Sequence, residues 1–164
     1  MGGNVIAGVL DGSGAETSKV ARTSGDPYLN SGVLLMDLDA LRSDRMLEKA
    51  TALYLEHECK LAWPDQCVIN KYAEGRKLVL HPGWNCRISA LEVTPAQFDS
   101  MLSDPDLSIL HFITSMKAWQ TWCEPRVSAF WWQYANRAQI DGLAPQEVST
   151  IGEAILFARM LDMS

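Results

Sequence analysis

The chain lacks an excess of positive charge. It has 14 Lys and Arg against 20 Asp and Glu, which gives a formal net charge of −6, and its basic residues are scattered. Proteins that bind nucleic acids need gathered Lys and Arg to neutralise phosphates. We therefore expect no nucleic-acid partner.

Long apolar runs are also missing. None approaches the roughly 20 residues that a helix needs to cross a bilayer. Met1–Asn4 has neither the basic nor the apolar region of a signal peptide. We therefore expect no membrane segment in this chain and a cytoplasmic location. A targeting segment upstream of Met1 would instead allow the Golgi lumen.

The cysteines show no close pairing. There are four, Cys59, Cys67, Cys86 and Cys123, and no two have the C-x-x-C spacing of a zinc or redox site. His57 and Cys59 lie two residues apart on an expected helix, so they point to different faces. This spacing predicts free and at least partly buried thiols in a reducing compartment.

What the chain contains is ordinary for a globular protein. It has 164 residues, 48% of them hydrophobic and 21% charged, which is enough for a domain with its own core. Short apolar runs predict strands over Val5–Leu10, Gly32–Leu38, Lys77–His81 and Leu107–Ile113. Gly12–Asp26 is rich in Gly, Ser and Thr and predicts a loop. Because helical patterns alternate with the strands, we expect an α/β domain.

Helix signals lie between and after these strands. Ser43 is expected to cap a helix. The buried stripe of that helix would consist of Met46, Leu47, Ala50, Leu53 and Tyr54. A second helix should open at Pro64 and stop near Gly75, and Pro82-Gly83 predicts a turn. Thr94-Pro95-Ala96-Gln97 fits a capping box at the start of a third helix.

The end of the chain is expected to be helical. Pro125 would open a helix with four apolar residues on one face, namely Val127, Phe130, Trp131 and Tyr134. A last helix is expected over Pro145–Phe157.

Polar residues cluster where two of the apolar elements begin. Asn30-Ser31-Gly32 offers several donors and acceptors, and glycine lets the backbone approach a ligand closely. These groups suit a hydroxyl-rich sugar, and they also suit an ordinary turn. Asp65-Gln66 opens an expected helix, where Asp65 is either a helix cap or a carboxylate that would stabilise positive charge developing on a sugar.

Three segments, taken in order, resemble the glycosyltransferases of family 8, retaining enzymes that move a sugar from a nucleotide donor. They read YLNSGVLLM at Tyr28–Met36, PDQCVIN at Pro64–Asn70 and HFITSMKAW at His111–Trp119. They are similar to the family's Tyr/Phe-x-Asn-Ala/Ser-Gly-Val-Leu, Asp-Gln-Asp-x-x-Asn and His-x-x-Gly-x-x-Lys-Pro-Trp stretches. The resemblance runs from about Val5 to Tyr134.

The resemblance implies which residues meet the donor sugar. Asn30, with Ser31 beside it, would contact the sugar. Asp65 and Gln66 would line it, and Gln66 would be a candidate nucleophile or stabiliser. Asp11 stands where family members often have an aspartate near the sugar, although it is also well placed to be a plain loop start.

The resemblance also implies a metal and a phosphate contact. His111 would be a ligand of Mn²⁺ and Lys117 would bind the donor diphosphate, while a histidine at the end of a strand is also common as a structural residue. Three positions depart from the family. Cys67 replaces a second acidic residue, Thr114 replaces Gly beside the diphosphate, and Ala118 replaces Pro.

Two acidic pairs have the Asp-x-Asp spacing of the family's metal site. Asp37-Leu38-Asp39 lies at an expected helix entry and Asp104-Pro105-Asp106 in an expected turn. Both positions predict local structural roles rather than metal ligation. The metal-binding pair is instead expected upstream of Asn4.

The fold that the resemblance implies is a partial GT-A type, an α/β domain with a mixed sheet and a helical C-terminal end. Residues 1–124 would form the C-terminal half of a catalytic domain, and residues 125–164 a helical extension packed on it. The implied reaction is Mn²⁺-dependent hexosyl transfer from UDP-glucose or UDP-galactose to a sugar or other hydroxyl acceptor.

Because the main metal-binding carboxylates would be missing, we expect little or no activity from this chain alone. We also expect self-association, since a half-domain exposes strand edges and an apolar face. The alternative is a non-catalytic remnant domain that binds a glycan or a protein partner.

Overall fold

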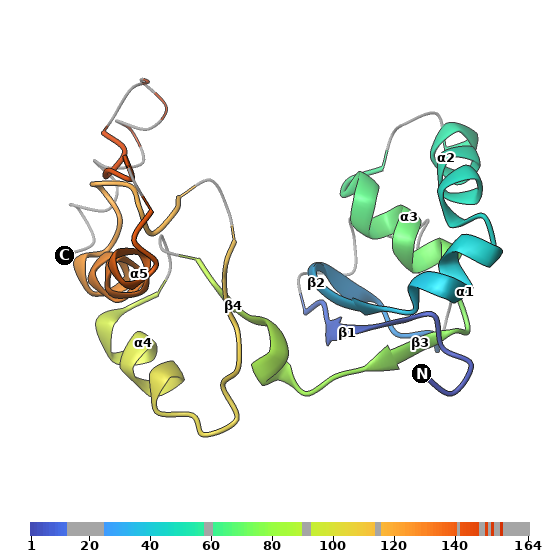
Figure 1. Cartoon of the computed structure of the whole chain (residues 1–164), viewed down its shortest axis with the longest axis horizontal. Coiled ribbons are helices and arrows are strands. Elements are labelled where there is room, and N and C mark those ends of the chain that lie inside the picture. Colours follow the sequence, from blue (N-terminus) through green and yellow to red (C-terminus); the bar gives the residue numbers. More distant parts are fainter. Residues whose placement is uncertain are drawn as a thin grey trace. The chain divides into compact units, whose positions relative to one another are not determined.

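The computed structural model describes residues 1–12, 25–57, 61–89, 93–113, 116–140, 142–147, 150, 152 and 155. The chain divides into two compact units, Met1–Asn85 and Cys86–Ser164, whose elements are labelled in Figure 1.

The first unit is built on a mixed three-stranded sheet of order β2-β1-β3. Strand β1 spans Ile6–Leu10, β2 spans Leu29–Met36 and β3 spans Lys77–Val79. β1 pairs antiparallel with β2 and parallel with β3. The three expected strands are confirmed, with β3 shorter than expected. β2 begins three residues earlier than expected, so Asn30 and Ser31 lie inside the strand and not in a turn before it.

Three helices pack on one face of this sheet (Figure 1): α1 at Leu38–Ser43, α2 at Met46–Glu56 and α3 at Pro64–Tyr72. Alternate residues of a strand point to opposite faces, and Ile6 of β1 turns toward the helices. The buried core there consists of Val5, Ile6, Leu29, Leu41, Tyr72 and Ala73. This packing fixes α3 against the start of β2.

The expected helix start at Ser43 is wrong. Asp37 caps α1 instead, because its Oδ1 accepts the Ala40 backbone N–H at 3.0 Å, and Ser43 is the last residue of that helix. α2 begins only after Arg45, which has a left-handed backbone with φ 54°.

The expected stripe on α2 is narrower than the sequence suggests. Ala50 is buried and Met46, Leu53 and Tyr54 are half-buried. Leu47, however, is 77% exposed, so the prediction that it faces the core is wrong.

The second unit contains a parallel strand pair, β4 at Cys86–Ile88 and β5 at Leu110–Phe112. α4 spans Pro95–Leu102 and α5 spans Pro125–Arg137. The expected capping box at Thr94 is confirmed, since both of its reciprocal hydrogen bonds are present. The core of this unit consists of Ile88, Phe98, Met116, Ala118, Trp122, Cys123 and Val127.

Two expectations about the chain end need correction. Tyr134 is exposed and does not share the buried face of α5 with Val127. Residues 145–147 are not helical, because Gln146 forms an isolated bridge with Gln120.

Two other predictions fall largely outside the described residues. They are most of the expected loop at Gly12–Asp26 and most of the expected last helix. Within the described residues, no helix is both long and apolar enough to cross a membrane.

Candidate functional site

Polar side chains from four separate segments of the first unit meet in one cluster. Its members are Asp11 after β1, Asn30 and Ser31 in β2, Asp65 and Gln66 at the start of α3, and Asn85 at the end of the 3₁₀ turn η1 (Pro82–Asn85). The pairing of β1 with β2 brings the first two segments together, and the Asp11 backbone N–H donates to the Tyr28 carbonyl at 2.9 Å. The structure thus unites five residues that the sequence singled out: Asp11, Asn30, Ser31, Asp65 and Gln66.

Gln66 lies at the centre of the cluster and is only 5% exposed. Its Oε1 accepts hydrogen bonds from Asn30 Nδ2 and from the Ser31 backbone N–H, both at 3.0 Å. Its Nε2 donates to Asp11 Oδ2 at 2.6 Å. An amide oxygen has two acceptor sites, so these two donors occupy the Gln66 oxygen fully. Gln66 is therefore held rigidly between β2 and the end of β1.

Asp65 lies beside Gln66 on the exposed edge of the cluster. Its Oδ2 accepts the Ser31 hydroxyl at 2.7 Å. It does not cap α3, because the cap residue is Trp63 and no side chain bonds there. The prediction that Asp65 is a helix cap is therefore wrong, and its role toward a sugar stays a prediction. The carboxylate belongs to the cluster and remains open to solvent.

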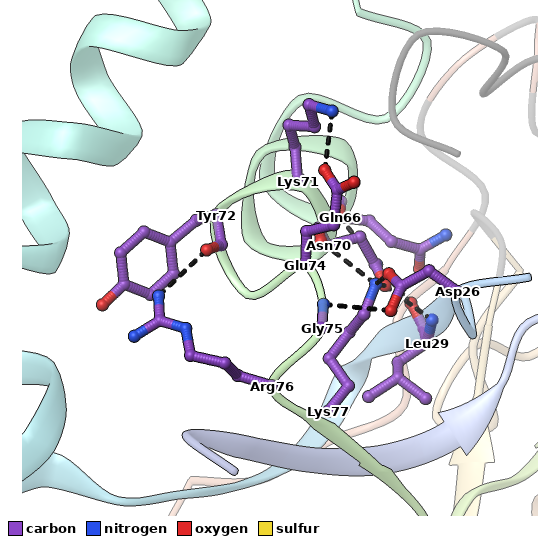
Figure 2. A network of polar contacts seen from close by, with 10 residues as sticks. All are labelled: Asp26, Leu29, Gln66, Asn70, Lys71, Tyr72, Glu74, Gly75, Arg76 and Lys77. Atoms are coloured by element: carbon purple, nitrogen blue, oxygen red, sulfur yellow. Dashed lines mark hydrogen bonds and ion pairs between the residues drawn. The ribbon is translucent and has the colours of Figure 1, made fainter. Parts of the chain in front are cut away.

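Asn70 clamps α3 to β2 beneath the cluster, and Figure 2 shows the side chain between the two elements. Its Oδ1 accepts the Leu29 N–H at 2.7 Å, and its Nδ2 donates to the carbonyls of Leu29 at 2.7 Å and Gln66 at 2.9 Å. All three bonds are buried. A buried amide with its polar atoms satisfied specifies one arrangement of the elements it joins.

Lys77 supports this clamp from β3 (Figure 2). Its side chain is almost fully buried and forms an ion pair with Asp26. Its ammonium group also donates to the Asn70 carbonyl at 3.1 Å, and the Gly75 N–H donates to Asp26 Oδ1 at 3.1 Å. Burial of an ammonium group is tolerated because a carboxylate and a carbonyl replace its water.

Cys67 points into the protein, away from the polar cluster. It is buried, its Sγ lies 3.2 Å from the Tyr28 hydroxyl, and Leu61 packs beside the pair. A second acidic residue here would place a charge in a largely apolar environment. Cys67, Cys86 and Cys123 are free thiols, as predicted. Burial is the main cause that raises the pKa of the Cys123 thiol to about 12.

His111 and Lys117 lie in the second unit, on and after β5. Burial, followed by the charges of Lys117 and Arg87, lowers the pKa of His111, so its imidazole is mostly neutral at pH 7. Lys117 Nζ donates to the Phe112 carbonyl at 2.7 Å, and its backbone N–H donates to Gln120 Oε1 at 2.6 Å. The structure therefore brings His111 and Lys117 near each other, and their roles toward metal and phosphate stay predictions.

The two departures near Lys117 have different outcomes. Ala118 is fully buried in the core of the second unit, in the same cluster as Trp122. Thr114 lies outside the described residues.

Neither Asp-x-Asp pair forms a metal site among the described residues. Asp37 caps α1, Asp39 pairs with Arg42 at 3.2 Å, and Asp104 accepts the Asp106 N–H at 2.9 Å. Across the described part of the chain, no group of three or more His, Cys, Asp or Glu could hold a metal ion.

Sequence reasoning missed three residues that organise the cluster: Asn70, Lys77 and Asn85. Asn70 is the last residue of the segment Pro64–Asn70, and the similarity of that segment to a family stretch was the only sequence feature that could have indicated it. Asn85 follows an expected turn but contacts a residue 55 positions away, and nothing local marks such a contact.

Comparison with known proteins places the chain among glycosyltransferases. The model of glycosyl transferase family 8 matches residues 1–123. Lipopolysaccharide 1,2-glucosyltransferase of Escherichia coli is 27% identical over 131 residues, covering 74% of this chain and 38% of that protein. Glycosyltransferase GlyF of Streptococcus pneumoniae is 28% identical over 107 residues, covering 65% of this chain and 27% of the relative. Both relatives are bacterial and give no support to a Golgi location.

A solved structure shares the fold. Galactosyltransferase LgtC, in complex with donor and acceptor sugar analogues, superimposes with a TM-score of 0.62 at 16% identity, covering 85% of this chain and 54% of that one. This likeness confirms the expected α/β fold with a mixed sheet. The chain spans less than half of the two relatives' length and about half of the LgtC chain.

Proposed function

The chain belongs to glycosyl transferase family 8, and from this premise we propose that its polar cluster holds the sugar of a UDP-hexose donor in a retaining transfer. The observation that carries the proposal is the meeting of Asp11, Asn30, Asp65 and Gln66 at one place. Carboxylates and amides in alternation match the hydroxyl groups of a hexose, which both donate and accept hydrogen bonds.

A transfer that retains the anomeric configuration of the sugar explains what the carboxylates would do. Positive charge develops on the sugar ring as the bond to the diphosphate lengthens, and nearby carboxylates stabilise it. Asp65 is exposed beside Ser31, and Asp11 lies behind Gln66. Gln66, with both acceptor sites of its oxygen occupied, acts as a rigid amide that orients the sugar and not as a free nucleophile in this state. UDP-glucose and UDP-galactose are the donors we propose, with a sugar or other hydroxyl group as acceptor.

Mn²⁺ would neutralise the charge of the diphosphate leaving group. The neutral imidazole of His111 suits one coordination position, and Lys117 would contact the diphosphate as a point charge. The described residues contain no group of three candidate ligands, so the remaining oxygen ligands would come from elsewhere. Because the described residues do not by themselves supply a complete Mn²⁺ site, we expect this chain alone to turn over donor slowly or not at all.

Calorimetric titration of the chain with UDP, UDP-glucose and UDP-galactose tests the proposal, with and without Mn²⁺. We expect at least one UDP-hexose to bind more tightly than UDP. In Asp65→Asn, which removes the exposed carboxylate, this advantage should fall roughly fivefold to tenfold because a charge-assisted hydrogen bond is lost. Asp39→Asn, an exposed aspartate on α1, is the matched control and should change nothing.

Equal affinity for UDP and both UDP-hexoses in the folded wild-type chain would refute the sugar site. Glycan binding that does not depend on UDP would favour the non-catalytic alternative. A donor hydrolysis assay completes the test, and ready turnover by the isolated chain would contradict the expectation of weak activity.

A further inference from the structure

Two backbone N–H groups fix the direction of the amides in the cluster. A backbone N–H can only donate a hydrogen bond. The Ser31 N–H points at Gln66, so the atom it meets at 3.0 Å must be the Gln66 oxygen. The Gly32 N–H likewise requires the Asn30 oxygen, which it meets at 3.0 Å. The remaining nitrogen of each amide therefore points the other way, and the orientation follows from chemistry.

With these directions fixed, the cluster forms a one-way chain of donors. Asn85 Nδ2 donates to Asn30 Oδ1 at 2.8 Å, Asn30 Nδ2 donates to Gln66 Oε1 at 3.0 Å, and Gln66 Nε2 donates to Asp11 Oδ2 at 2.6 Å. Asp11 is a carboxylate that accepts, so it ends the chain. Asn85 begins the chain and is only 2% exposed.

We propose that Asn85 is a positioning residue for the sugar site: by donating to Asn30, it sets the direction in which the Gln66 amide faces Asp11. The identity of the ligand rests on the proposed function. The chain of hydrogen bonds does not, because it is present in the structure without a ligand. The Asn85 amide donates to the Asn30 oxygen at 2.8 Å. It acts through Asn30, whose oxygen receives both Asn85 and Gly32.

The reverse direction would be unfavourable at every link. If the Asn30 amide turned round, its NH₂ would face the Gly32 N–H and its oxygen would face Gln66 Oε1. If Gln66 then turned as well, its NH₂ would face the Ser31 N–H and its oxygen would face the Asp11 carboxylate. Unpaired polar groups in a buried cluster are costly, so one donor at the head of the chain influences all of it.

Asn85→Asp tests the direction with almost no change in shape. The new carboxylate accepts hydrogen bonds and cannot donate to Asn30. We expect the side-chain amide resonances of Asn30 and Gln66 to shift in ¹H–¹⁵N spectra, although Gln66 lies two hydrogen bonds away from the substitution. Asn85→Ala removes the donor without adding charge and should shift the same resonances. Asn4→Asp is the charge-matched control, because the Asn4 side-chain amide donates to the Met1 carbonyl at 3.2 Å and takes no part in the chain of donors. It should leave these resonances unchanged.

Binding gives the second readout. The affinity of both Asn85 variants for UDP-glucose and UDP-galactose should fall about tenfold, as expected for the loss of one partly buried hydrogen bond. The affinity for UDP alone should stay the same. A merely structural role would lower stability and weaken all three ligands together. Measuring the ratio of UDP-hexose to UDP affinity separates the two roles.

The results decide between the two proposals. Unchanged Asn30 and Gln66 resonances in folded Asn85→Ala would overturn the role of Asn85, whatever the wild-type chain binds. Shifted resonances with no loss of the affinity ratio would also overturn it as a positioning role for the sugar. If the wild-type chain binds neither UDP-hexose better than UDP, the sugar site itself fails, and the resonances alone then decide whether Asn85 directs Gln66.

Discussion

At the scale of single residues, amides and not ion pairs hold the candidate site together. An amide both donates and accepts, so Asn30, Gln66 and Asn70 can each join two or three segments of chain. The carboxylates of Asp11 and Asp65 stand at the ends of these links. Asp65 keeps its charge exposed to solvent, whereas the buried charge of Lys77 in the supporting structure is neutralised by Asp26.

Asp44 is a strongly perturbed carboxyl of the first unit. It accepts hydrogen bonds from Lys49, from the Tyr72 hydroxyl at 2.7 Å and from Arg76 at 3.2 Å. The hydrogen bond from Lys49 is the largest of the causes that lower the pKa of Asp44 from the ordinary 3.8 to about 2. These bonds join the α1–α2 junction to α3 and to the residue before β3.

This shift predicts how stability depends on pH. The folded-state pKa lies below the unfolded one, so the stabilisation by Asp44 is fully present above about pH 4 to 5 and is lost as pH falls through 3.8 toward 2. Asp44→Asn should therefore be less stable than wild type at pH 6, with the gap in unfolding free energy closing by about pH 2. Urea unfolding at several pH values measures the gap. Asp39→Asn should show no comparable gap, and a gap in Asp44→Asn that stays constant down to pH 2 would contradict the prediction.

At the scale of elements, the start of a helix could be predicted where adjacent residues gave one clear capping signal. It could not be predicted where two nearby residues were both suitable caps. The start of α4 follows from four adjacent residues, and its capping box is confirmed. Ser43 has the same chemistry as Thr94, but Asp37 caps a helix six residues earlier and Ser43 becomes its end. Asn30 and Asp65 were found because their segments are similar to family stretches. The contact between Asn30 and Asn85 depends on the folded sheet, so no short pattern reveals it.

The cap of α4 provides a test at this scale. Thr94 accepts the Gln97 N–H, and Gln97 Oε1 accepts the Thr94 N–H at 2.9 Å. Thr94→Ala removes one of these bonds and should lower the unfolding free energy by about 1 kcal/mol. Chemical denaturation followed by circular dichroism measures it. Ser100→Ala, within the same helix, should change stability by less than about 0.5 kcal/mol, and an equal loss in both variants would argue against the cap.

At the scale of the whole molecule, the family match runs through residue 123 and so includes all of the first unit and part of the second. The first unit has helices on one sheet face. Ala7 points to the opposite face, because Ile6 beside it faces the helices. Its partners in register, Leu35 and Leu78, lie on that opposite face too and are 57% and 44% exposed. Ala7 itself is fully buried, so the exposed apolar area on this face belongs to the leucines of the two edge strands. Exposed apolar side chains of this kind are typical of an interaction surface.

Self-association through this face is the prediction that follows for the isolated chain. β2 and β3 are also edges of the described sheet, and edge strands with exposed apolar side chains tend to pair with other chains. Sedimentation velocity should show dimers or larger species whose fraction grows with concentration. The double substitution Leu35→Ser and Leu78→Ser should shift the chain toward monomer, because it removes the apolar area buried on association. Leu47→Ser changes a leucine that is even more exposed, at 77%, but lies on α2 and not on the sheet. It should leave the distribution unchanged. A wild-type chain that sediments as a monomer at every concentration would show that these exposed leucines do not drive association.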